Sequence, residues 1–252
     1  MGKNSKISWT DHTFNCWMGC SKVSSGCVNC YAELLMDKRY GRVKWGSEGT
    51  RIKTSEKYWK QPHKWNKEAK AACIRQRVFC ASLADVFEFK HDQPEMWEWR
   101  AELFNLILET PNLDWLLLTK RPENIKRMIP PSWLDGLPGN IWIGASAENQ
   151  KTYIDRCLYL ATVPAHIKFL SMEPLLGPIN LGESYWLPDW IIVSGESGSK
   201  ARPMNQKWVV DLKDQCLRYD VSFFFKGWGK HIPEWQLGND TLYGESWLEL
   251  PL

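Results

Sequence analysis

The sequence predicts an α/β fold, a complete or partial (β/α) barrel with parallel strands inside and helices outside. Three observations predict it. A chain of 252 residues has the length of one such barrel. Short apolar runs alternate with longer amphipathic stretches, and several of the apolar runs end in the same Ser-x-Glu pattern. Continuous apolar strands separated by helices are typical of a parallel sheet that is buried on both faces.

The expected elements follow one another at the spacing of βα units. A short first strand is expected at 7–10. Later strands are expected at 77–82, 114–119, 140–146, 167–171, 190–194 and 221–226, and helices at 31–36, 95–109, 123–128, 150–161 and 205–218. We therefore expect a single domain, 1–252. It carries a cysteine loop at 15–33, a basic aromatic insertion at 38–77, and a tail at 231–252 that closes the barrel or covers its open edge.

Ionisable side chains gather where the expected strands end. In each Ser-x-Glu run the serine and the glutamate point the same way, because residues i and i+2 of a strand share a face. The carboxyl ends of the strands are where β/α barrels place their chemistry. The expected ring consists of Asp85, Lys120, Glu148, Glu173, Glu196, Arg202 and Lys226. Some of these groups are expected to pair with one another, and the ring as a whole suits a zwitterionic, hydroxyl-rich ligand.

The cysteines divide into a cluster and a scattered set. Cys16, Cys20, Cys27 and Cys30 lie close together, a spacing that indicates a metal or iron–sulfur site rather than disulfides. Zinc held by all four sulfurs fits this spacing. A cubane iron–sulfur cluster held by three of them, with one iron open to a ligand, also fits. The other cysteines lie in apolar contexts and are expected to be buried: Cys73, Cys80, Cys157 and Cys216.

The charge is distributed unevenly. The segment 38–77 holds 13 Lys or Arg against three Glu, a local charge of +10 in a chain of net charge +3. It also holds Trp45, Tyr58, Trp59 and Trp65, and such a mixture indicates a nucleic acid partner, because phosphates bind cations and bases stack on aromatic rings. The alternative is a solvated, Lys-rich insertion whose tryptophans pack on the barrel.

The sequence contains no apolar run of membrane-spanning length, and its first residues lack the apolar core of a signal peptide. We therefore expect a cytoplasmic protein with reduced cysteines and no membrane partner.

Five motifs, taken together, resemble a known family. They are GCSKVSSGCVNCYAE at 19–33, LTKRP at 118–122, EPLLGP at 173–178, SGESG at 194–198 and FFFKGWG at 223–229. In this order they resemble a phage-associated domain family of unassigned function, which is similar to radical S-adenosylmethionine (SAM) iron–sulfur enzymes. The resemblance runs from about residue 9 to residue 229, and it implies a barrel of the radical SAM type.

The resemblance implies a cofactor site and a reaction. Cys20, Cys27 and Cys30 would hold a [4Fe–4S] cluster whose fourth iron binds SAM, and one electron would cleave SAM to a 5′-deoxyadenosyl radical that abstracts a substrate hydrogen. The implied substrate is a nucleic acid base or nucleotide, modified or repaired in a phage or mobile-element setting, so the localisation would be the host cytoplasm. An electron donor such as a flavodoxin or ferredoxin is implied as a second partner.

Roles within the ring follow from this reading. We assign Lys120, Glu173 and Lys226 to catalysis. We assign cofactor binding to Tyr31, Asp85, Glu148, Glu196 and Arg202.

Two features depart from the usual radical SAM pattern. The three cysteines are spaced x6 and x2, where x3 and x2 is common, and Cys16 is an additional thiol. Cys16 is either an accidental neighbour or a fourth ligand that would close the cluster. Two other readings stay open: a zinc-stabilised nucleic-acid-binding module without catalysis, and a metal-independent barrel hydrolase or lyase that uses the ring carboxylates.

Overall fold

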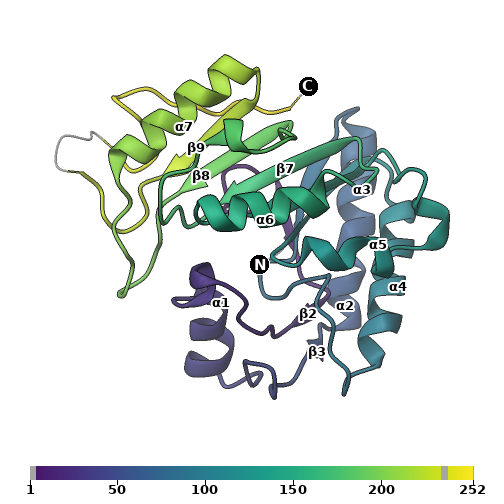
Figure 1. The fold of residues 1–252 in the computed structure, drawn as a ribbon. Coiled ribbons are helices and arrows are strands. Elements are labelled where there is room, and N and C mark those ends of the chain that lie inside the picture. The colour runs from purple at the N-terminus through teal and green to yellow at the C-terminus, as the bar shows by residue number, and fades with distance from the viewer. Residues whose placement is uncertain (1–3, 234–237, 252) are drawn as a thin grey trace.

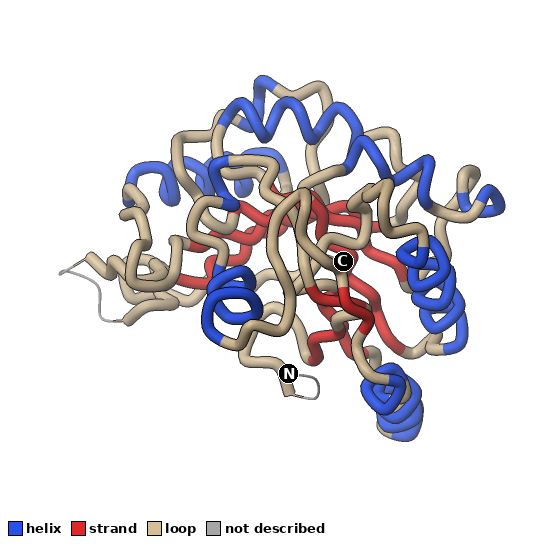
Figure 2. The backbone as a smooth tube through the Cα atoms, turned by 90° about the horizontal axis from the view of Figure 1, so that it is seen from below, coloured by secondary structure: helices blue, strands red, loops and turns tan. Residues whose placement is uncertain are grey.

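The computed structural model describes residues 4–233 and 238–251. Seven parallel strands form one curled sheet in the order β1-β4-β5-β6-β7-β8-β9, with helices on its outer side (Figures 1 and 2). The sheet is thus a half-barrel. Its strands are β1 (His12–Phe14), β4 (Gln76–Cys80), β5 (Leu113–Thr119), β6 (Ile141–Ser146), β7 (Ile167–Met172), β8 (Trp190–Ser194) and β9 (Ser222–Gly227). The expected parallel barrel, in its partial form, is confirmed.

The helices lie between these strands. They are α1 (Tyr31–Glu33), α2 (Glu56–Trp59), α3 (Gln61–Ala71), α4 (Glu95–Glu109), α5 (Ile125–Met128), α6 (Gln150–Leu160) and α7 (Gln206–Tyr219). Helices α1 and α4 to α7 fall within or close to the predicted ranges, whereas α2 and α3 lie in the basic insertion, where no helix range was predicted. A π-helical stretch, Leu34–Arg39, continues α1, and a short antiparallel pair joins β2 (Trp17–Met18) to β3 (Ile52–Lys53). Asn149 caps α6 by accepting a hydrogen bond from the backbone of Thr152, which places its start directly after β6.

The first strand was predicted at the wrong place. Residues 7–10 form a turn in which the backbone of Thr10 donates to Ile7, and the strand begins at His12. The apolar character of this stretch has another cause, because Trp9 is buried against the inner face of the sheet. One thiol was also misplaced: Cys73 is exposed at the end of α3, whereas Cys80, Cys157 and Cys216 are buried as expected.

The two faces of the sheet form separate cores. Side chains on the outer face pack against the helices, and the inner face carries its own cluster of large apolar residues. Trp190 lies at its centre, with ring centroids 5.8 Å from Phe169 and 5.9 Å from Phe224. This aromatic floor leaves the carboxyl ends of the strands as the polar part of the concave face.

Gly144 of β6 allows the floor to close. A Cβ at this position would lie 2.3 Å from the ring of Phe169, which is fully buried. We expect Gly144→Ala to lower the free energy of unfolding by about 1–3 kcal/mol, the usual range for an overpacked core. Urea unfolding of the two proteins measures this difference. Gly139→Ala is the matched control, since a Cβ there meets no atom within 4 Å, and an equal loss in both variants would contradict the argument.

The tail lies along the last strand. Leu248 forms an antiparallel bridge with Phe224, and the backbone of Phe225 donates to the carbonyl of Trp247 at 2.8 Å. The tail therefore covers the β9 edge of the half-barrel.

The aromatic residues of the basic insertion are used for packing. Trp65 is buried and stacks on His12 with ring centroids 4.4 Å apart, and Tyr58 and Trp59 pack on the ring of Phe14. Trp45 packs on a small cluster behind the cysteine loop. These contacts favour the alternative reading for the four rings, in which they pack on the barrel, most clearly for the buried Trp65.

Several lysines of the insertion remain exposed. They follow one another on one side of α2 and α3, opposite the buried Pro62, Trp65 and Ala69. We call this row the lysine stripe: Lys57, Lys60, Lys64, Lys67 and Lys70. Among the described residues, no helix has the length and apolar character that a membrane span requires.

Candidate metal centre

The ring of polar side chains stands above the aromatic floor, as the alternation of the strands requires. On β6, Trp142 and Gly144 face inward and are followed on the same face by Ser146 and Glu148. Neighbouring strand ends touch across the ring, because Lys120 Nζ donates to Ser146 Oγ at 2.9 Å. The structure thus brings the carboxyl ends of β5 and β6 together as the repeat predicted.

Glu173 and Lys226 occupy the β7–β9 side of the ring. Lys226 pairs with the Oε2 atom of Glu173, whose Oε1 accepts hydrogen bonds from Trp9 Nε1 at 3.2 Å and from Ser171 Oγ at 3.1 Å. Both side chains are only partly covered. Like Lys120, they remain partly accessible on the ring.

The cysteine loop lies over this ring and is tied to it from β6 and β8. Glu148 Oε1 accepts a hydrogen bond from Ser24 Oγ at 2.7 Å, and Glu196 Oε2 accepts one from Asn29 Nδ2 at 2.9 Å. Arg202 pairs with Glu196 and also donates to the carbonyl of Ser25 at 3.0 Å. Three of the predicted cofactor-binding residues, Glu148, Glu196 and Arg202, are therefore direct supports of the loop.

Gly26 allows the loop to approach the ring so closely. A Cβ on Gly26 would lie 2.4 Å from Glu148 Oε1, and that carboxylate cannot retreat because it is fully buried and paired with Arg156 at 2.9 Å. Tyr31 adds a contact from the far end of the loop, since its hydroxyl donates to the carbonyl of Ser82 at 2.7 Å.

A buried ion network fixes the other end of the loop. Arg121 Nη1 donates to Asp85 Oδ2 at 2.9 Å, and Arg121 Nη2 donates to the carbonyl of Ser21 at 2.9 Å. Glu88 accepts from the backbone of Ser21 at 3.0 Å and is paired with Arg51 at 2.6 Å. All four ionic side chains are nearly or fully buried, so the network fixes the loop at Ser21, the residue after Cys20.

Three of the loop thiols lie at this ring. Cys20 Sγ accepts a hydrogen bond from Arg121 at 3.6 Å, Cys27 Sγ lies 3.9 Å from Ser24 Oγ, and Cys30 is the N-cap residue of α1. Burial raises the pKa of the Cys30 thiol, and the N–H groups of Ala32 and Glu33 act against this rise. All three thiols are free and partly exposed.

Cys16 belongs to a different environment. It is fully buried in the helix-facing core, beside Cys80, whose pKa is raised by burial and by the neighbouring Cys16 thiol. The four cysteines therefore do not form one set of ligands, which argues against a zinc site closed by all four sulfurs. This environment favours the reading of Cys16 as an accidental neighbour of the loop thiols.

The three remaining thiols are not gathered around a single point. Within residues 4–233 and 238–251, no group of three or more His, Cys, Asp or Glu side chains is gathered as the ligands of one metal ion. In a cubane each thiolate binds a different iron, so its ligands need not converge on one point. Cys20, Cys27 and Cys30, three sulfurs on one loop beside the polar ring, are suitable ligands for three irons of such a cluster.

Three carboxylates of the ring, Asp85, Glu148 and Glu196, are poor candidates for general acids. Burial raises the pKa of Asp85. The charge of Arg121 lowers it, as do hydrogen bonds from Thr119, Lys120 and Phe87, and together they outweigh burial, so the pKa lies below its ordinary value. For Glu148 and Glu196, too, burial raises the pKa, but their cationic and hydrogen-bonding partners outweigh it, so that the pKa of each lies below its ordinary value. Groups that stay ionised at neutral pH cannot donate a proton, so in a hydrolase or lyase these three could act only as general bases.

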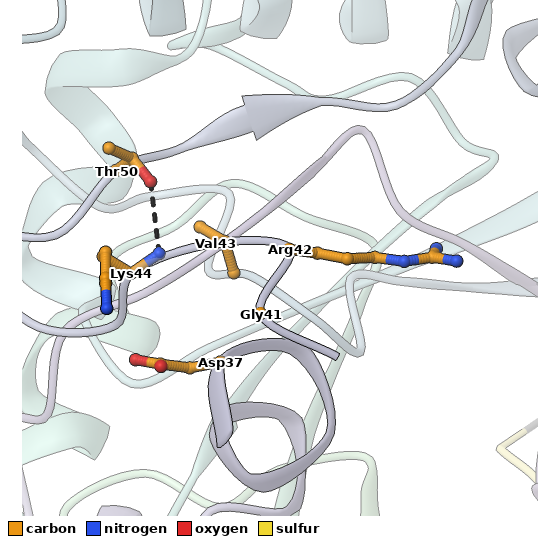
Figure 3. A pocket seen from close by; sticks show the side chains of 6 residues that line it. All are labelled: Asp37, Gly41, Arg42, Val43, Lys44 and Thr50. Carbon is orange, nitrogen blue, oxygen red and sulfur yellow. Dashed lines mark hydrogen bonds between the residues drawn. The ribbon is translucent and has the colours of Figure 1, made fainter. Parts of the chain in front are cut away.

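A separate hollow lies next to the helix that follows the loop. It measures about 190 Å³ and is lined by Asp37, Gly41, Arg42, Val43, Lys44 and Thr50 (Figure 3). Its carboxylate is engaged in the turn, because Asp37 Oδ2 accepts from the backbone of Trp45 at 2.8 Å, and Lys44 N donates to Thr50 Oγ1 at 3.2 Å. The hollow is thus part of the turn at 37–50, outside the ring.

Sequence reasoning missed the residues that fix the loop. Arg121 stood inside a quoted motif without a role, and Arg51 was counted among the charges of the basic segment. Glu88 and Arg156 carried no signal at all. The one sequence signal for Arg121 is its position in the Thr-Lys-Arg-Pro string directly after β5, at the carboxyl end of a strand. The fold then shows that this arginine is buried beside two carboxylates, and breaking such a buried arrangement usually destabilises the structure.

The fold and the ring define an architecture: a half-barrel of seven parallel strands with a cysteine loop over the carboxyl ends of its strands. The chain belongs to the family described as "Protein of unknown function (DUF5131)", whose model matches residues 4–251. No curated protein matches the chain.

Solved structures of spore photoproduct lyase share the fold. Two single mutants of that protein, at 11% sequence identity each, give TM-scores of 0.53 and 0.50 over 90% of this chain and 78% of theirs. A double mutant with bound AdoMet and dinucleoside spore photoproduct gives 0.48 at 13% identity over 89% of this chain. The chain spans 58% of the length of that last protein.

Proposed function

We propose that this protein is a radical SAM enzyme that cleaves SAM reductively at a [4Fe–4S] cluster and acts on a nucleic acid base or nucleotide, in modification or repair. One observation carries the proposal. Cys20, Cys27 and Cys30 lie free on a loop tied over the carboxyl ends of a half-barrel, while Cys16 is buried elsewhere. The likeness to spore photoproduct lyase supports the fold on which the proposal depends.

The cysteines would hold the cluster, which when bound supplies the electron that converts SAM to methionine and a hydrogen-abstracting 5′-deoxyadenosyl radical. The chain's own part is to fix the loop and the reacting groups. Asp85, Glu148, Glu196 and Arg202 support the cofactor by holding the loop on the ring, and Tyr31 holds the start of α1 beside Cys30.

Lys120, Glu173 and Lys226 are the groups we assign to substrate. Both ammonium groups offer donors to anionic or carbonyl oxygens of a nucleotide, and Glu173 offers an acceptor while it orients Lys226. The aromatic floor beneath them excludes water from below, which strengthens the electrostatic contacts that these three groups can make. The expected setting is a phage or mobile element, with a flavodoxin or ferredoxin as electron donor.

Anaerobic purification tests the proposal. The protein is expected to be brown and to contain about four irons and four sulfides per chain. A colourless protein that holds one zinc per chain would contradict the proposal and favour the binding module.

The lysine stripe is the surface we assign to nucleic acid. Its five side chains are all exposed and lie at helical spacing along α2 and α3. α2 begins near the ring, because Thr54 Oγ1 donates to the carbonyl of Asn15 at 2.7 Å at the end of β1. A phosphate backbone bound along the stripe would thus reach the open β1 edge of the half-barrel.

Salt dependence measures this contact. Each phosphate neutralised by a lysine contributes a slope of about 0.9 to the fall of log K with log salt on duplex DNA. We expect the triple variant Lys60→Gln, Lys64→Gln, Lys67→Gln to bind a defined duplex more weakly, with a slope reduced by about 3.

The control removes three exposed lysines from other helices, Lys126, Lys151 and Lys207. A loss of slope in both triple variants would show a general charge effect. A flat salt dependence in the wild type would remove the nucleic acid assignment.

A further inference from the structure

Arg121 contacts a sulfur of the candidate cluster site. Its side chain is 8% exposed, and its Nη1 atom donates to both the Sγ of Cys20 and the Oδ2 of Asp85, at 3.6 and 2.9 Å. Its Nη2 atom donates to the carbonyl and the hydroxyl of Ser21 at 2.9 and 2.8 Å. A single guanidinium thus spans the end of β5, the segment after β4, and the cysteine loop.

The charges around Cys20 balance only while Arg121 is present. Asp85 and Glu88 supply two negative charges, and Arg121 and Arg51 supply two positive ones, all nearly or fully buried. Arg51 is committed to Glu88, with contacts of 2.6 and 2.8 Å, whereas Arg121 reaches the sulfur itself. Without Arg121, two buried carboxylates and one arginine would remain around the Cys20 sulfur, a net charge of −1 before any cluster is counted.

We infer that Arg121 is a positioning residue that holds Cys20 in place and sets, by its charge, how easily a cluster bound there accepts an electron. This inference rests on the proposed function. A cation next to a ligand sulfur favours the reduced state, because reduction adds negative charge to a centre that thiolates already make negative. Burial strengthens the effect, since little water is present to screen it.

Opposite charge changes in the same network should move the reduction potential in opposite directions. Arg121→Gln removes a positive charge and should lower the midpoint potential of the cluster. Glu88→Gln removes a negative charge that faces the same guanidinium at 3.2 Å and should raise it. Arg121→Lys keeps the charge and should stay close to the wild type. A merely structural role would give loss of cluster in each variant, without this pattern of signs.

The experiment is a redox titration of the reconstituted holoprotein, with the reduced cluster followed by electron paramagnetic resonance. Arg75→Gln is the matched control. It removes an arginine of the same charge at the opposite end of β5, where Arg75 pairs with Asp114 at 2.6 Å, and should leave the potential unchanged. Should Arg121→Gln fail to hold a cluster, Arg121→Lys supplies the test: it should hold a cluster at the potential of the wild type, and a clearly different potential would overturn the role of the Arg121 charge.

The outcomes separate this inference from the proposed function. A wild type that takes up no cluster overturns both. A wild type that holds a cluster, with potentials that do not move or that move the same way in Arg121→Gln and Glu88→Gln, overturns only the role of Arg121.

Discussion

Replacement of Cys20, Cys27 or Cys30 by alanine is expected to abolish assembly of the [4Fe–4S] cluster, whereas Cys16→Ala should assemble it as the wild type does. The physical reason is the separation of the thiols, since three lie on the ring and Cys16 is enclosed in the helix-facing core. Iron and sulfide analysis after anaerobic reconstitution gives the answer. The three ring variants should hold none, and Cys16→Ala about four of each per chain.

Cys80→Ala is the control for the cost of losing a buried thiol. It removes the neighbour of Cys16 from the same core, so any loss of folding stability common to both variants is a packing effect. A bleached Cys16→Ala protein beside a brown Cys80→Ala protein would show that Cys16 is a ligand, and the assignment of three ligands would be wrong.

The second large effect is expected at Glu148. Its carboxylate is fully buried and pairs with Arg156 at 2.9 Å, and Glu148→Gln would leave that arginine buried without its partner charge. The free energy of unfolding is expected to fall by about 3–5 kcal/mol, as for other broken buried ion pairs. Urea unfolding of the cluster-free protein at neutral pH, where Glu148 is ionised, measures the loss.

Ser24→Ala distinguishes the contribution of the ion pair to stability from that of the loop hydrogen bond. It removes the 2.7 Å hydrogen bond between the loop and Glu148 and leaves Arg156 paired, so it should cost only about 1 kcal/mol. Equal losses in the two variants would mean that Glu148 stabilises the protein through the loop alone.

The regular part of the fold could be predicted because it is encoded locally. Each strand from β4 onward is a short apolar run, and the period of two places Ser146 with Glu148, and Ser171 with Glu173, on the inner face. The first strand could not be located in the same way. Trp9 gives its segment an apolar pattern, but the tryptophan fills the floor of the half-barrel from a turn.

The candidate site was predictable only in part, since its supports come from distant segments. Arg51, Glu88 and Arg121 meet around the cysteine loop although 70 residues separate the first from the last. Counting charges along the chain placed Arg51 among solvated cations, and only the fold shows that it is buried. The position of Cys16 was also not predictable. Its spacing in the sequence groups it with the loop thiols, but in the fold it is buried in the helix-facing core.

The most direct test is to reduce the reconstituted wild-type protein anaerobically in the presence of SAM and to search for 5′-deoxyadenosine. The account predicts that the wild type forms it and that Cys27→Ala does not. A wild type that carries four irons and four sulfides, accepts an electron and leaves SAM intact would contradict the account.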